Sequence, residues 1–562
     1  MRILLLIHGF NALSQRLYVE LREAGHEVTI EFDVSDASTL EAVRLAAPDL
    51  ILAPYLKRKI PAAVWRHHLC LVLHPGPPGD AGPAALDWAI LDGARDWGVT
   101  LFEATDEYDS GPIWATRSFP IRAATKASLY RHEVTEAAIA CFFEAIDVID
   151  AGQRLPPQQL PQTQRFRHTP RQRDRAIDWQ ADTTDDVLRK LYASDGTPGV
   201  RSVIGTGMVH LHDGHRAIGL TGRPGAMIAR SGSAVAIATR DGAVWIGHMR
   251  NAASNHPFKL PAAQIVDASH LPEVRGYDDI TYREAGPIGF LSFAFLNGAM
   301  GTQACERLLY AYEKALARPT KVLVLEGGQD VWSNGMDLNL IEAAPNPGDE
   351  SWHNINAMDD LAEAVLRTDD KLTVAAVGGN AGAGGVFLAR ACDKVWLRAG
   401  VVLNPHYKDM GNLFGSEFWT YSLPRFTSPE QADAIASNRL PMGAREAERL
   451  GLADLVIDGS RADFHEAVAR RAEQLAGGKW SDRIEEKSAC RNDDEADKPL
   501  AAYRAEELAK MRQNFFGFDP SYHIARSNFV RKVPKARTPL NLAQHRNING
   551  SWNTGSSLEE AS

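Results

Sequence analysis

The stretch Leu71-Val-Leu-His-Pro-Gly-Pro-Pro-Gly-Asp-Ala-Gly-Pro83 leads from an apolar strand into a rigid loop rich in proline and glycine. Upstream, apolar strand-like runs alternate with helical patterns, at 3–7, 14–24, 28–32, 40–46 and 49–54. Continuous apolar strands separated by helices predict a parallel sheet covered on both faces. Ligands bind at the carboxyl ends of such strands. We therefore expect 8–11, 53–56 and 73–76 to lie together beside a ligand site.

The remaining chain predicts several further α/β and β segments, which makes the fold class α/β and multidomain. A chain of 562 residues has room for about three or four domains. Prolines and glutamines mark a linker, a helix over 184–192 with Thr184 as its N-cap follows, and short strands with an Asp241-Gly242 hairpin turn predict a small barrel. We expect the end from about residue 540 to be polar and frayed. The predicted segments are 1–150 (α/β domain), 151–200 (linker and short helix), 201–275 (small OB-like β-barrel), 276–480 (second α/β domain) and 481–562 (helical extension and polar tail).

Composition excludes some classes of protein. The net charge of −10 gives no general reason to expect nucleic-acid binding. No apolar run approaches the roughly 20 residues of a membrane span. Five cysteines are scattered without the spacing of a zinc ribbon, which favours a reducing compartment: Cys70, Cys141, Cys305, Cys392 and Cys490. The sequence predicts a cytoplasmic protein without a metal site.

A histidine and an aspartate are the candidate catalytic pair of the N-terminal half. His74 stands where the strand meets the Pro/Gly loop, and Asp109-Ser-Gly follows a later strand. A histidine oriented by a carboxylate can stabilise an oxyanion and shuttle a proton, which formyl transfer requires. The alternative is that His74 is a structural hydrogen-bonding residue.

These residues resemble the formyl-tetrahydrofolate-dependent transferase family, whose fingerprint is Asn-x-His-Pro…Gly with a later Asp-Thr/Ser-Gly. The resemblance covers about 1–270 and implies a Rossmann-like formyltransferase domain that binds formyl-tetrahydrofolate. It implies that His74 and Asp109 are catalytic and that Gln15 and Asp80 bind the cofactor. The family's asparagine falls on Val72, so an ordinary amine acceptor is not expected.

Two glycine-rich segments characterise the C-terminal half, Gly327–Leu338 and Val374–Ala389. Thioester chemistry needs two backbone N–H groups that converge on the carbonyl oxygen, and glycine lets the backbone approach closely. A tight turn or close packing is the alternative explanation. With Met442–Asp454 downstream, the segments resemble the crotonase (enoyl-CoA hydratase/isomerase) family over about 285–480.

The crotonase resemblance implies a coenzyme A site. The implied oxyanion donors are the N–H groups of Asn334 and Gly384, and the residues along CoA are Trp332, Met336, Asp337 and Gly385. The hydratase glutamates fall on Phe387 and near His406, so simple hydration is not expected.

The run from Asn404 to Tyr421 carries the alternative ionisable groups. We predict that Tyr407 and Glu417 remove or relay a proton, because a carboxyl in an apolar pocket can be held near a neutral pKa. The alternative is that this run is a packed aromatic wall.

The fused layout resembles the HypX (HoxX) family of [NiFe]-hydrogenase maturation proteins, on Leu13–Arg16, His74–Asp80, Leu86–Ile90 and Gly415–Tyr421. The resemblance implies formyl transfer from formyl-tetrahydrofolate to CoA and decomposition of formyl-CoA to carbon monoxide and CoA. The implied partners are small molecules and the maturation proteins that receive carbon monoxide, with no nucleic acid and no membrane.

Two other functions remain open. A formyl-tetrahydrofolate hydrolase or amine N-formyltransferase with a degenerate CoA-binding domain predicts turnover without CoA. A non-catalytic assembly module predicts tight ligand binding without turnover.

Overall fold

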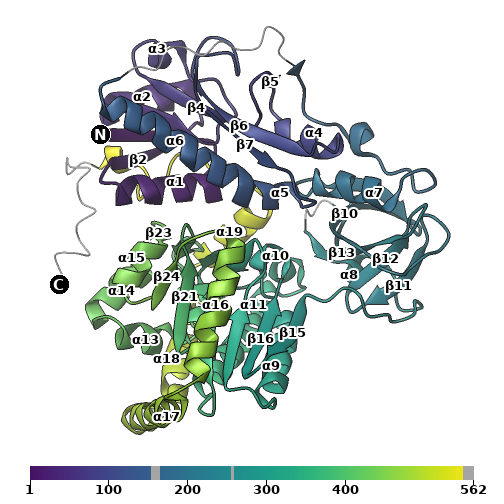
Figure 1. The fold of residues 1–562 in the computed structure, drawn as a ribbon, viewed down its shortest axis with the longest axis vertical. Coiled ribbons are helices and arrows are strands. Elements are labelled where there is room, and N and C mark those ends of the chain that lie inside the picture. The colour runs from purple at the N-terminus through teal and green to yellow at the C-terminus, as the bar shows by residue number, and fades with distance from the viewer. Residues whose placement is uncertain (154–164, 255–257, 548–562) are drawn as a thin grey trace. The chain divides into compact units, whose positions relative to one another are not determined.

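The structure is a computed structural model that describes residues 1–153, 165–254 and 258–547. The chain divides into two compact units, one formed by Met1–Tyr277 with the segment that begins at Pro534, the other by Asp278–Val533. Each unit contains its own sheets and helices (Figure 1). The predicted α/β multidomain class is confirmed.

The first sheet of the N-terminal unit has the strand order β2-β1-β3-β4-β6-β7. Strands β1 to β4 are parallel, and β6 runs antiparallel to both β4 and β7. The strands are β1 (Arg2–Ile7), β2 (Glu27–Phe32), β3 (Leu50–Ala53), β4 (Cys70–His74), β6 (Asp96–Glu103) and β7 (Ile113–Pro120). The helices are α1 (Ala12–Glu23), α2 (Asp36–Ala46), α3 (Ala62–Trp65), α4 (Ala85–Leu91), α5 (Lys126–Leu129), the π-helical η1 (Tyr130–Val134) and α6 (Thr135–Asp150).

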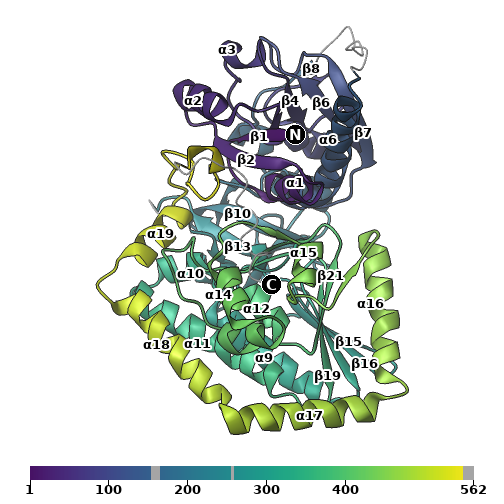
Figure 2. The same cartoon turned by 90° about the vertical axis from the view of Figure 1, so that its left-hand side faces the viewer.

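Helices cover both faces of this sheet, which explains its continuously apolar strands. Leu4 and Leu6 of β1 pack in one cluster with Val43 of α2 and Val64 of α3. The other face is covered by α1 and by α6, which packs on β6 and β7 (Figure 2). Ile3–Ile7 of β1 and Leu50–Ala53 of β3 are buried and continuously apolar, as strands covered on both faces require. The predicted covered parallel sheet is confirmed for β1 to β4.

The carboxyl ends of β1, β3 and β4 lie side by side, as predicted. The His8 N–H donates to the Tyr55 carbonyl at 2.8 Å, just beyond β1 and β3. His74 is the last residue of the adjacent strand β4. The sheet therefore places its candidate histidine at the edge where open α/β sheets bind ligands.

The second sheet of this unit has the order β11-β12-β13-β10-β9, with β14 paired to β13. The Asp241-Gly242 hairpin between β12 and β13 is confirmed. Among the described strands β9 and β11 end this order unpaired with each other, so the OB-like barrel stays a prediction. The elements are η2 (Gln172–Arg175), α7 (Thr184–Tyr192), β9 (Val200–Ile204), β10 (Gly207–Arg216), β11 (Met227–Ser231), β12 (Ala234–Ala238), β13 (Ala243–Asn251), β14 (Leu260–Pro261) and α8 (Ala262–Ile265).

Two details of the predicted linker region differ. The N-cap of α7 is Thr183, whose hydroxyl accepts from the Asp186 N–H, and the Thr184 hydroxyl instead bonds to Thr239. Within the predicted linker, residues 154–164 lie outside the described residues, and Arg165–Phe166 forms strand β8, which pairs with β5 (Asp80–Ala81).

Residues 534–547, which we call the C-terminal strap, pack on β2 of the first sheet. The Phe32 N–H donates to the Thr538 hydroxyl at 2.7 Å, and Thr29 bonds to His545 at 2.8 Å. Within the strap, η5 spans Gln544–Arg546, and Arg546 pairs with Glu31 at 3.1 Å. The expectation of a frayed end is therefore wrong for residues 540–547, and residues 548–562 lie outside the described part.

His545→Ala is expected to lower the free energy of opening of the β2 amides by about 2–3 kcal/mol, because it removes a buried ring and its bond to Thr29. Native-state hydrogen exchange measures this quantity directly. Asn547→Ala is the matched control, since Asn547 is exposed at the end of the same segment. Equal protection of β2 in both variants would contradict a stabilising strap.

The C-terminal unit contains a six-stranded sheet in the order β15-β16-β17-β19-β21-β24 and a four-stranded sheet in the order β18-β20-β22-β23. The first consists of β15 (Ile280–Ala285), β16 (Ile288–Phe293), β17 (Val322–Glu326), β19 (Leu372–Val377), β21 (Lys394–Arg398) and β24 (Leu455–Ile457). The second consists of β18 (Val331–Ser333), β20 (Asn380–Gly382), β22 (Val402–Asn404) and β23 (Met442–Gly443).

Alternate residues of the large sheet face different helices. Leu323 and Leu325 belong to the cluster that includes α9 and α11, whereas Val322 and Val324 pack with Phe464 of α16. The helical extension predicted within 481–562 begins with α17 and α18, and α18 packs along α11 (Figure 2). The helices are η3 (Leu296–Gly298), α9 (Thr302–Leu316), α10 (Leu338–Ala343), α11 (Pro347–Leu366), α12 (Gly384–Arg390), α13 (Trp419–Ser422), η4 (Leu423–Arg425), α14 (Pro429–Ser437), α15 (Ala444–Arg449), α16 (Arg461–Ala476), α17 (Trp480–Asp497), α18 (Leu500–Phe516) and α19 (Ser521–Val530).

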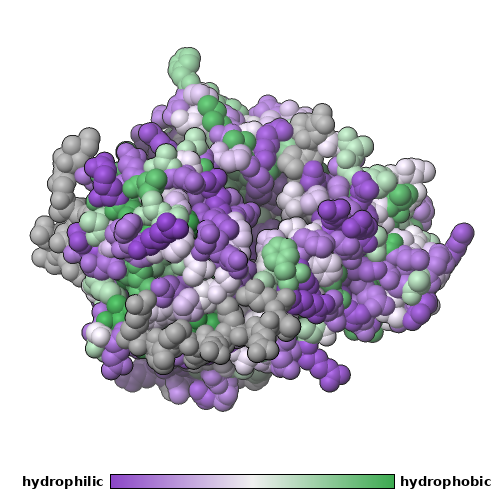
Figure 3. Space-filling view, turned by 90° about the horizontal axis from the view of Figure 1, so that it is seen from above, coloured by the Kyte–Doolittle hydropathy of each residue, from purple (hydrophilic) through white to green (hydrophobic). Residues whose placement is uncertain are grey.

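Polar and apolar side chains are mixed on the surface. Hydrophilic side chains predominate on the face shown in Figure 3, with hydrophobic ones scattered among them. Within the described ranges, we find no helix with the length and apolar character needed to cross a membrane.

Candidate active sites

His74 lies between two carboxylates in the N-terminal unit. Its Nε2 is 2.9 Å from Asp80 Oδ2, and its Nδ1 is 3.4 Å from Asp109 Oδ1. The imidazole is almost fully buried, with 4 % of its surface exposed. Each ring nitrogen thus faces a group that can orient it or exchange a proton with it.

Asp80 is itself fixed by neighbouring structure. It lies in β5, which pairs with β8, and its second oxygen is 3.1 Å from the Arg167 guanidinium. Arg167 also pairs with Asp92 at 2.6 Å. The arginine compensates the buried charge of Asp80, which would otherwise be costly to bury.

In the Pro/Gly loop after β4, the backbone at Gly76 lies very close to the side chains of His74 and Asp80. A Cβ at Gly76 would lie 2.5 Å from His74 Nε2 and 2.6 Å from Asp80 Oδ2, so only glycine leaves the pair intact. Asp109 has a left-handed backbone, with φ of 52°, and its Oδ2 accepts the Gly82 N–H at 3.0 Å. This bond ties the Asp-Ser-Gly loop to the histidine loop.

Val72, at the family's asparagine position, and Gln15, a predicted cofactor-binding residue, lie on different elements. Val72 lies two residues before His74 on the same strand and is half-buried, so an apolar side chain stands where the resembled family has an amide. Gln15 lies in the first turn of α1, and its amide donates to the Phe10 carbonyl at 3.1 Å. The role of Gln15 in cofactor binding stays a prediction.

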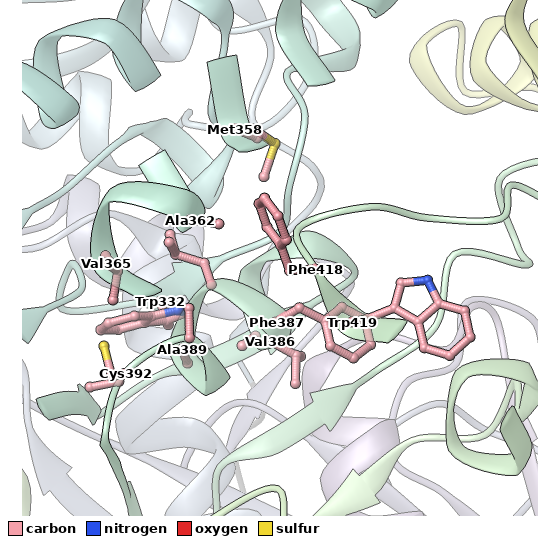
Figure 4. Packing of buried hydrophobic residues seen from close by; sticks show 14 of the residues in the cluster. Trp332, Met358, Ala362, Val365, Val386, Phe387, Ala389, Cys392, Phe418 and Trp419 are labelled. Atoms are coloured by element: carbon pink, nitrogen blue, oxygen red, sulfur yellow. The ribbon is translucent and has the colours of Figure 1, made fainter. Parts of the chain in front are cut away.

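Tyr407 and Glu417 form a buried pair in the C-terminal unit. The Tyr407 hydroxyl lies 2.5 Å from Glu417 Oε2 and 3.0 Å from the Ser416 carbonyl. Phe387, at the hydratase glutamate position, stacks on Tyr407 with ring centroids 5.4 Å apart, and it contacts Trp419 (Figure 4). The run is therefore an aromatic wall and also carries an ionisable pair.

Glu417 lies directly beside the glycine at the start of α12. A Cβ at Gly384 would collide with the Glu417 carboxyl, so the glycine makes room for it. Burial, with the negative charges of Asp359 and Glu507, raises the pKa of Glu417 to about 8. Burial and the neighbouring Glu417 raise the pKa of Tyr407 well above its usual value. The structure thus brings three of the predicted residues together: Gly384, Tyr407 and Glu417.

The loop predicted to lie along CoA is engaged mostly in structural contacts. Trp332 is 1 % exposed in the core, and its indole N–H donates to the Gly385 carbonyl at 2.9 Å (Figure 4). Asp337 caps α10 by accepting the Leu340 N–H at 3.1 Å. The expectation that Trp332 lies along the cofactor is therefore not supported, since a buried core ring offers no face to a ligand.

Of the two predicted oxyanion donors, Asn334 and Gly384, the first has a backbone partner. The Asn334 N–H already donates to the Gly298 carbonyl at 2.7 Å, so the structure does not support it as a free donor. Met336 is half-buried, and its backbone pairs with that of Met300 in an isolated parallel β-bridge. The donor role of Gly384 and the ligand role of Met336 stay predictions.

Two carboxylates near Glu417 did not emerge from the motifs. Asp359 of α11 and Glu507 of α18 are both fully buried. Glu507 stands seven residues after Leu500 and four before Met511, on the apolar stripe of its helix. This carboxylate on an apolar helical stripe is the sequence feature that could have identified Glu507, because a buried charge requires specific partners.

Comparison with known proteins agrees with both halves of the chain. Residues 31–146 match the family described as formyl transferase, residues 171–257 match formyl transferase, C-terminal domain, and residues 297–516 match enoyl-CoA hydratase/isomerase. A methionyl-tRNA formyltransferase from Nitrosospira multiformis is 28% identical over 171 residues, which cover 29% of this chain and 53% of that protein.

Two relatives match over nearly the whole length. The hydrogenase maturation factor HoxX from Bradyrhizobium diazoefficiens is 53% identical over 552 residues, or 97% of each chain. The crystal structure of HypX from Aquifex aeolicus in complex with tetrahydrofolic acid superposes with a TM-score of 0.95 at 48% identity, over 98% of this chain and 100% of that one.

The fold and the two sites define a protein class in which a formyltransferase-type half and an enoyl-CoA hydratase/isomerase-type half share one chain. Similarity at this level over the full length shows the particular family. The chain belongs to the HoxX (HypX) family of hydrogenase maturation factors.

Proposed function

We propose that this chain synthesises carbon monoxide for hydrogenase maturation from formyl-tetrahydrofolate and CoA. The tetrahydrofolic acid bound to the Aquifex relative supports folate as the formyl carrier. The enoyl-CoA hydratase/isomerase match supports an acyl-CoA as the intermediate. Hydrogenase maturation proteins are the proposed recipients of the carbon monoxide.

In the first reaction, the CoA sulfur attacks the formyl carbon of formyl-tetrahydrofolate. A C–S bond forms, the C–N bond to the folate breaks, and the thiol proton passes to the folate nitrogen. His74 is the group proposed to relay this proton, held between Asp80 and Asp109. A thiol acceptor is compatible with Val72, because no amide is needed to orient an amine.

In the second reaction, formyl-CoA splits into carbon monoxide and CoA. Glu417 takes the formyl proton, the C–S bond breaks with its electron pair on sulfur, and the Tyr407 hydroxyl protonates the sulfur. Glu417 then returns its proton to Tyr407 across their 2.5 Å bond. No water is consumed, and the pair ends in its starting state.

The observation that carries this proposal is the buried Tyr407–Glu417 pair beside Gly384, with Phe387 in place of a hydratase glutamate. Hydration needs carboxylates that position and activate water. An aromatic ring at that position removes one of them and leaves a base and an acid suited to proton removal and return.

Pure protein incubated with formyl-tetrahydrofolate and CoA tests the overall reaction, with gas trapped by deoxyhaemoglobin. Carbon monoxide that requires both substrates supports the proposal. Formate without CoA dependence would instead indicate the hydrolase, transfer to an amine would indicate an N-formyltransferase, and binding without product would indicate an assembly module.

Carbon monoxide release from formyl-CoA is expected to rise about tenfold per pH unit below pH 8 and to level off above it. The pKa of Glu417 is raised to about 8, so its ionised form, which is the base, becomes the major form only above that pH. Initial rates on supplied formyl-CoA, corrected for its spontaneous hydrolysis, give the profile. A rate that falls as pH rises through 8 would show that Glu417 acts as an acid.

A further inference from the structure

The turn that carries Glu417 has an unusual backbone. Glu417 and Phe418 both adopt left-handed conformations, with φ of 60° and 59°. Consecutive non-glycine residues rarely adopt this conformation, and surrounding structure must hold them there. The turn is packed among buried residues, and Figure 4 shows Phe418 between α11 and the start of α12.

Side-chain carboxylates from two helices hold this backbone. Asp359 of α11 accepts the Glu417 N–H at 2.8 Å. Glu507 of α18 accepts the Phe418 N–H at 3.0 Å, and its other oxygen accepts the Thr420 N–H at 2.9 Å and the Thr420 hydroxyl at 2.5 Å. Three of the four backbone N–H groups from Glu417 to Thr420 thus donate to two carboxylates.

A serine joins the two carboxylates. The fully buried Ser416 hydroxyl lies 2.8 Å from Asp359 Oδ2 and 3.3 Å from Glu507 Oε2. Because both neighbours of Glu417 are also fixed, its carboxyl is held next to Tyr407 by its own backbone. Asn514, one further residue of α18, accepts the Phe414 N–H at 3.0 Å and anchors the start of the same loop.

We propose that Asp359 and Glu507 are positioning residues of the acyl-CoA site, and that the C-terminal extension is present in order to supply Glu507. This inference rests on the proposed release of carbon monoxide. Neither residue touches the reacting atoms; each acts through the turn that aims Glu417 at Tyr407.

The same two residues set the electrostatics of Glu417. The charged or titratable groups around it are Tyr407, Asp359 and Asp360 of α11, Glu507 and Arg504 of α18, and Cys305 of α9. The cation of this set, Arg504, lies 4.0 Å from Asp359. Burial raises the pKa of Asp359 to about 7 and that of Glu507 to about 8. After burial, the negative charges of these two carboxylates are what raise the pKa of Glu417, so removal of either charge makes Glu417 ionise at lower pH.

Glu507→Gln tests the proposal on the full-length protein. Glutamine has one acceptor oxygen and places an NH2 group against the donors of the turn. We expect kcat for carbon monoxide release from formyl-CoA to fall on the order of ten- to a hundredfold with KM unchanged, and the midpoint of its pH profile to move to lower pH. Glu506→Gln is the matched control, because Glu506 is the neighbouring residue of α18, is exposed and pairs with Lys498 at 2.7 Å.

A double-variant cycle separates positioning from general damage to the fold. If Glu507 acts through Glu417, Glu507→Gln adds nothing to the loss caused by Glu417→Gln. Losses that multiply would overturn the proposal, as would a Glu507→Gln protein with the wild-type pH profile. Asp359→Asn, which changes the other half of the clamp, gives an independent reading if Glu507→Gln does not fold.

A failure of the proposed reaction is recognised separately. If wild-type protein releases no carbon monoxide from formyl-CoA, the reaction is wrong, and the positioning role is then judged from the Glu417 carboxyl itself. Its infrared C=O band, assigned by loss in Glu417→Gln, is expected to titrate at lower pH in Glu507→Gln than in Glu506→Gln. Equal midpoints would overturn the positioning role.

Discussion

Replacement of Glu417 by glutamine is expected to lower the rate of carbon monoxide release from formyl-CoA on the order of 10²- to 10⁴-fold. The amide keeps the shape of the side chain but cannot take the formyl proton. Formyl transfer to CoA is proposed to use the His74 site, so formyl-CoA is expected to accumulate when formyl-tetrahydrofolate and CoA are supplied. Chromatography of the acyl-CoA pool, together with the trapped gas, measures both effects.

Tyr407→Phe is expected to give the same accumulation, because the departing sulfur loses its proton donor. Matched controls are Glu430→Gln and Tyr310→Phe, which change exposed side chains of the same unit. A Glu417→Gln protein that releases carbon monoxide at the wild-type rate would assign the base to another group. Loss of CoA acylation in both variants would show that the two sites do not divide the chemistry as proposed.

Removal of the His74 side chain is expected to slow the first reaction, formyl transfer to CoA, and to leave carbon monoxide release intact. His74→Ala is expected to slow formyl transfer to CoA on the order of 10²- to 10⁴-fold, because the thiol proton loses its relay. Asp80→Asn is expected to act in the same direction, since the amide cannot orient the ring as the carboxylate does. Both proteins should still release carbon monoxide when formyl-CoA is supplied directly.

The control for this experiment is His67→Ala, which removes an exposed imidazole from the same unit. The assay follows CoA acylation by formyl-tetrahydrofolate and, separately, gas release from formyl-CoA. A His74→Ala protein that acylates CoA normally would leave His74 as a structural hydrogen-bonding residue. Formate production without CoA in the wild type would favour the hydrolase alternative.

Much of the first site follows from local patterns. The apolar run of β4 and the proline and glycine residues after it fix where His74 emerges from the sheet. The pairing of His74 with Asp109 was expected from the family fingerprint and not from strand direction, because Asp109 follows β6, which runs antiparallel to β4. The contribution of Arg167 could not be expected, because Arg167 follows Asp80 by 87 residues and reaches it through the pairing of β5 with β8.

The CoA loop shows where motif reasoning fails. The spacing of Trp332 and Asn334 matches the resembled family, but a motif does not state which side chains the core has claimed. The buried Trp332 indole N–H donates to the Gly385 carbonyl, and the Asn334 N–H donates to the Gly298 carbonyl. Both outcomes depend on packing between segments distant in sequence.

The two sites therefore show which features followed from the sequence and which depended on tertiary packing. By itself, the sequence determined the covered parallel sheet and the second α/β half, because strand periodicity and glycine turns are local properties, and its motifs predicted His74, Asp109, Tyr407 and Glu417 as site residues. Only the tertiary structure decided that Asp359 and Glu507 meet at the Glu417 turn and that the C-terminal strap closes on β2. Burial changes the proton affinity of a carboxylate and selects its partners, and burial exists only once distant segments pack together.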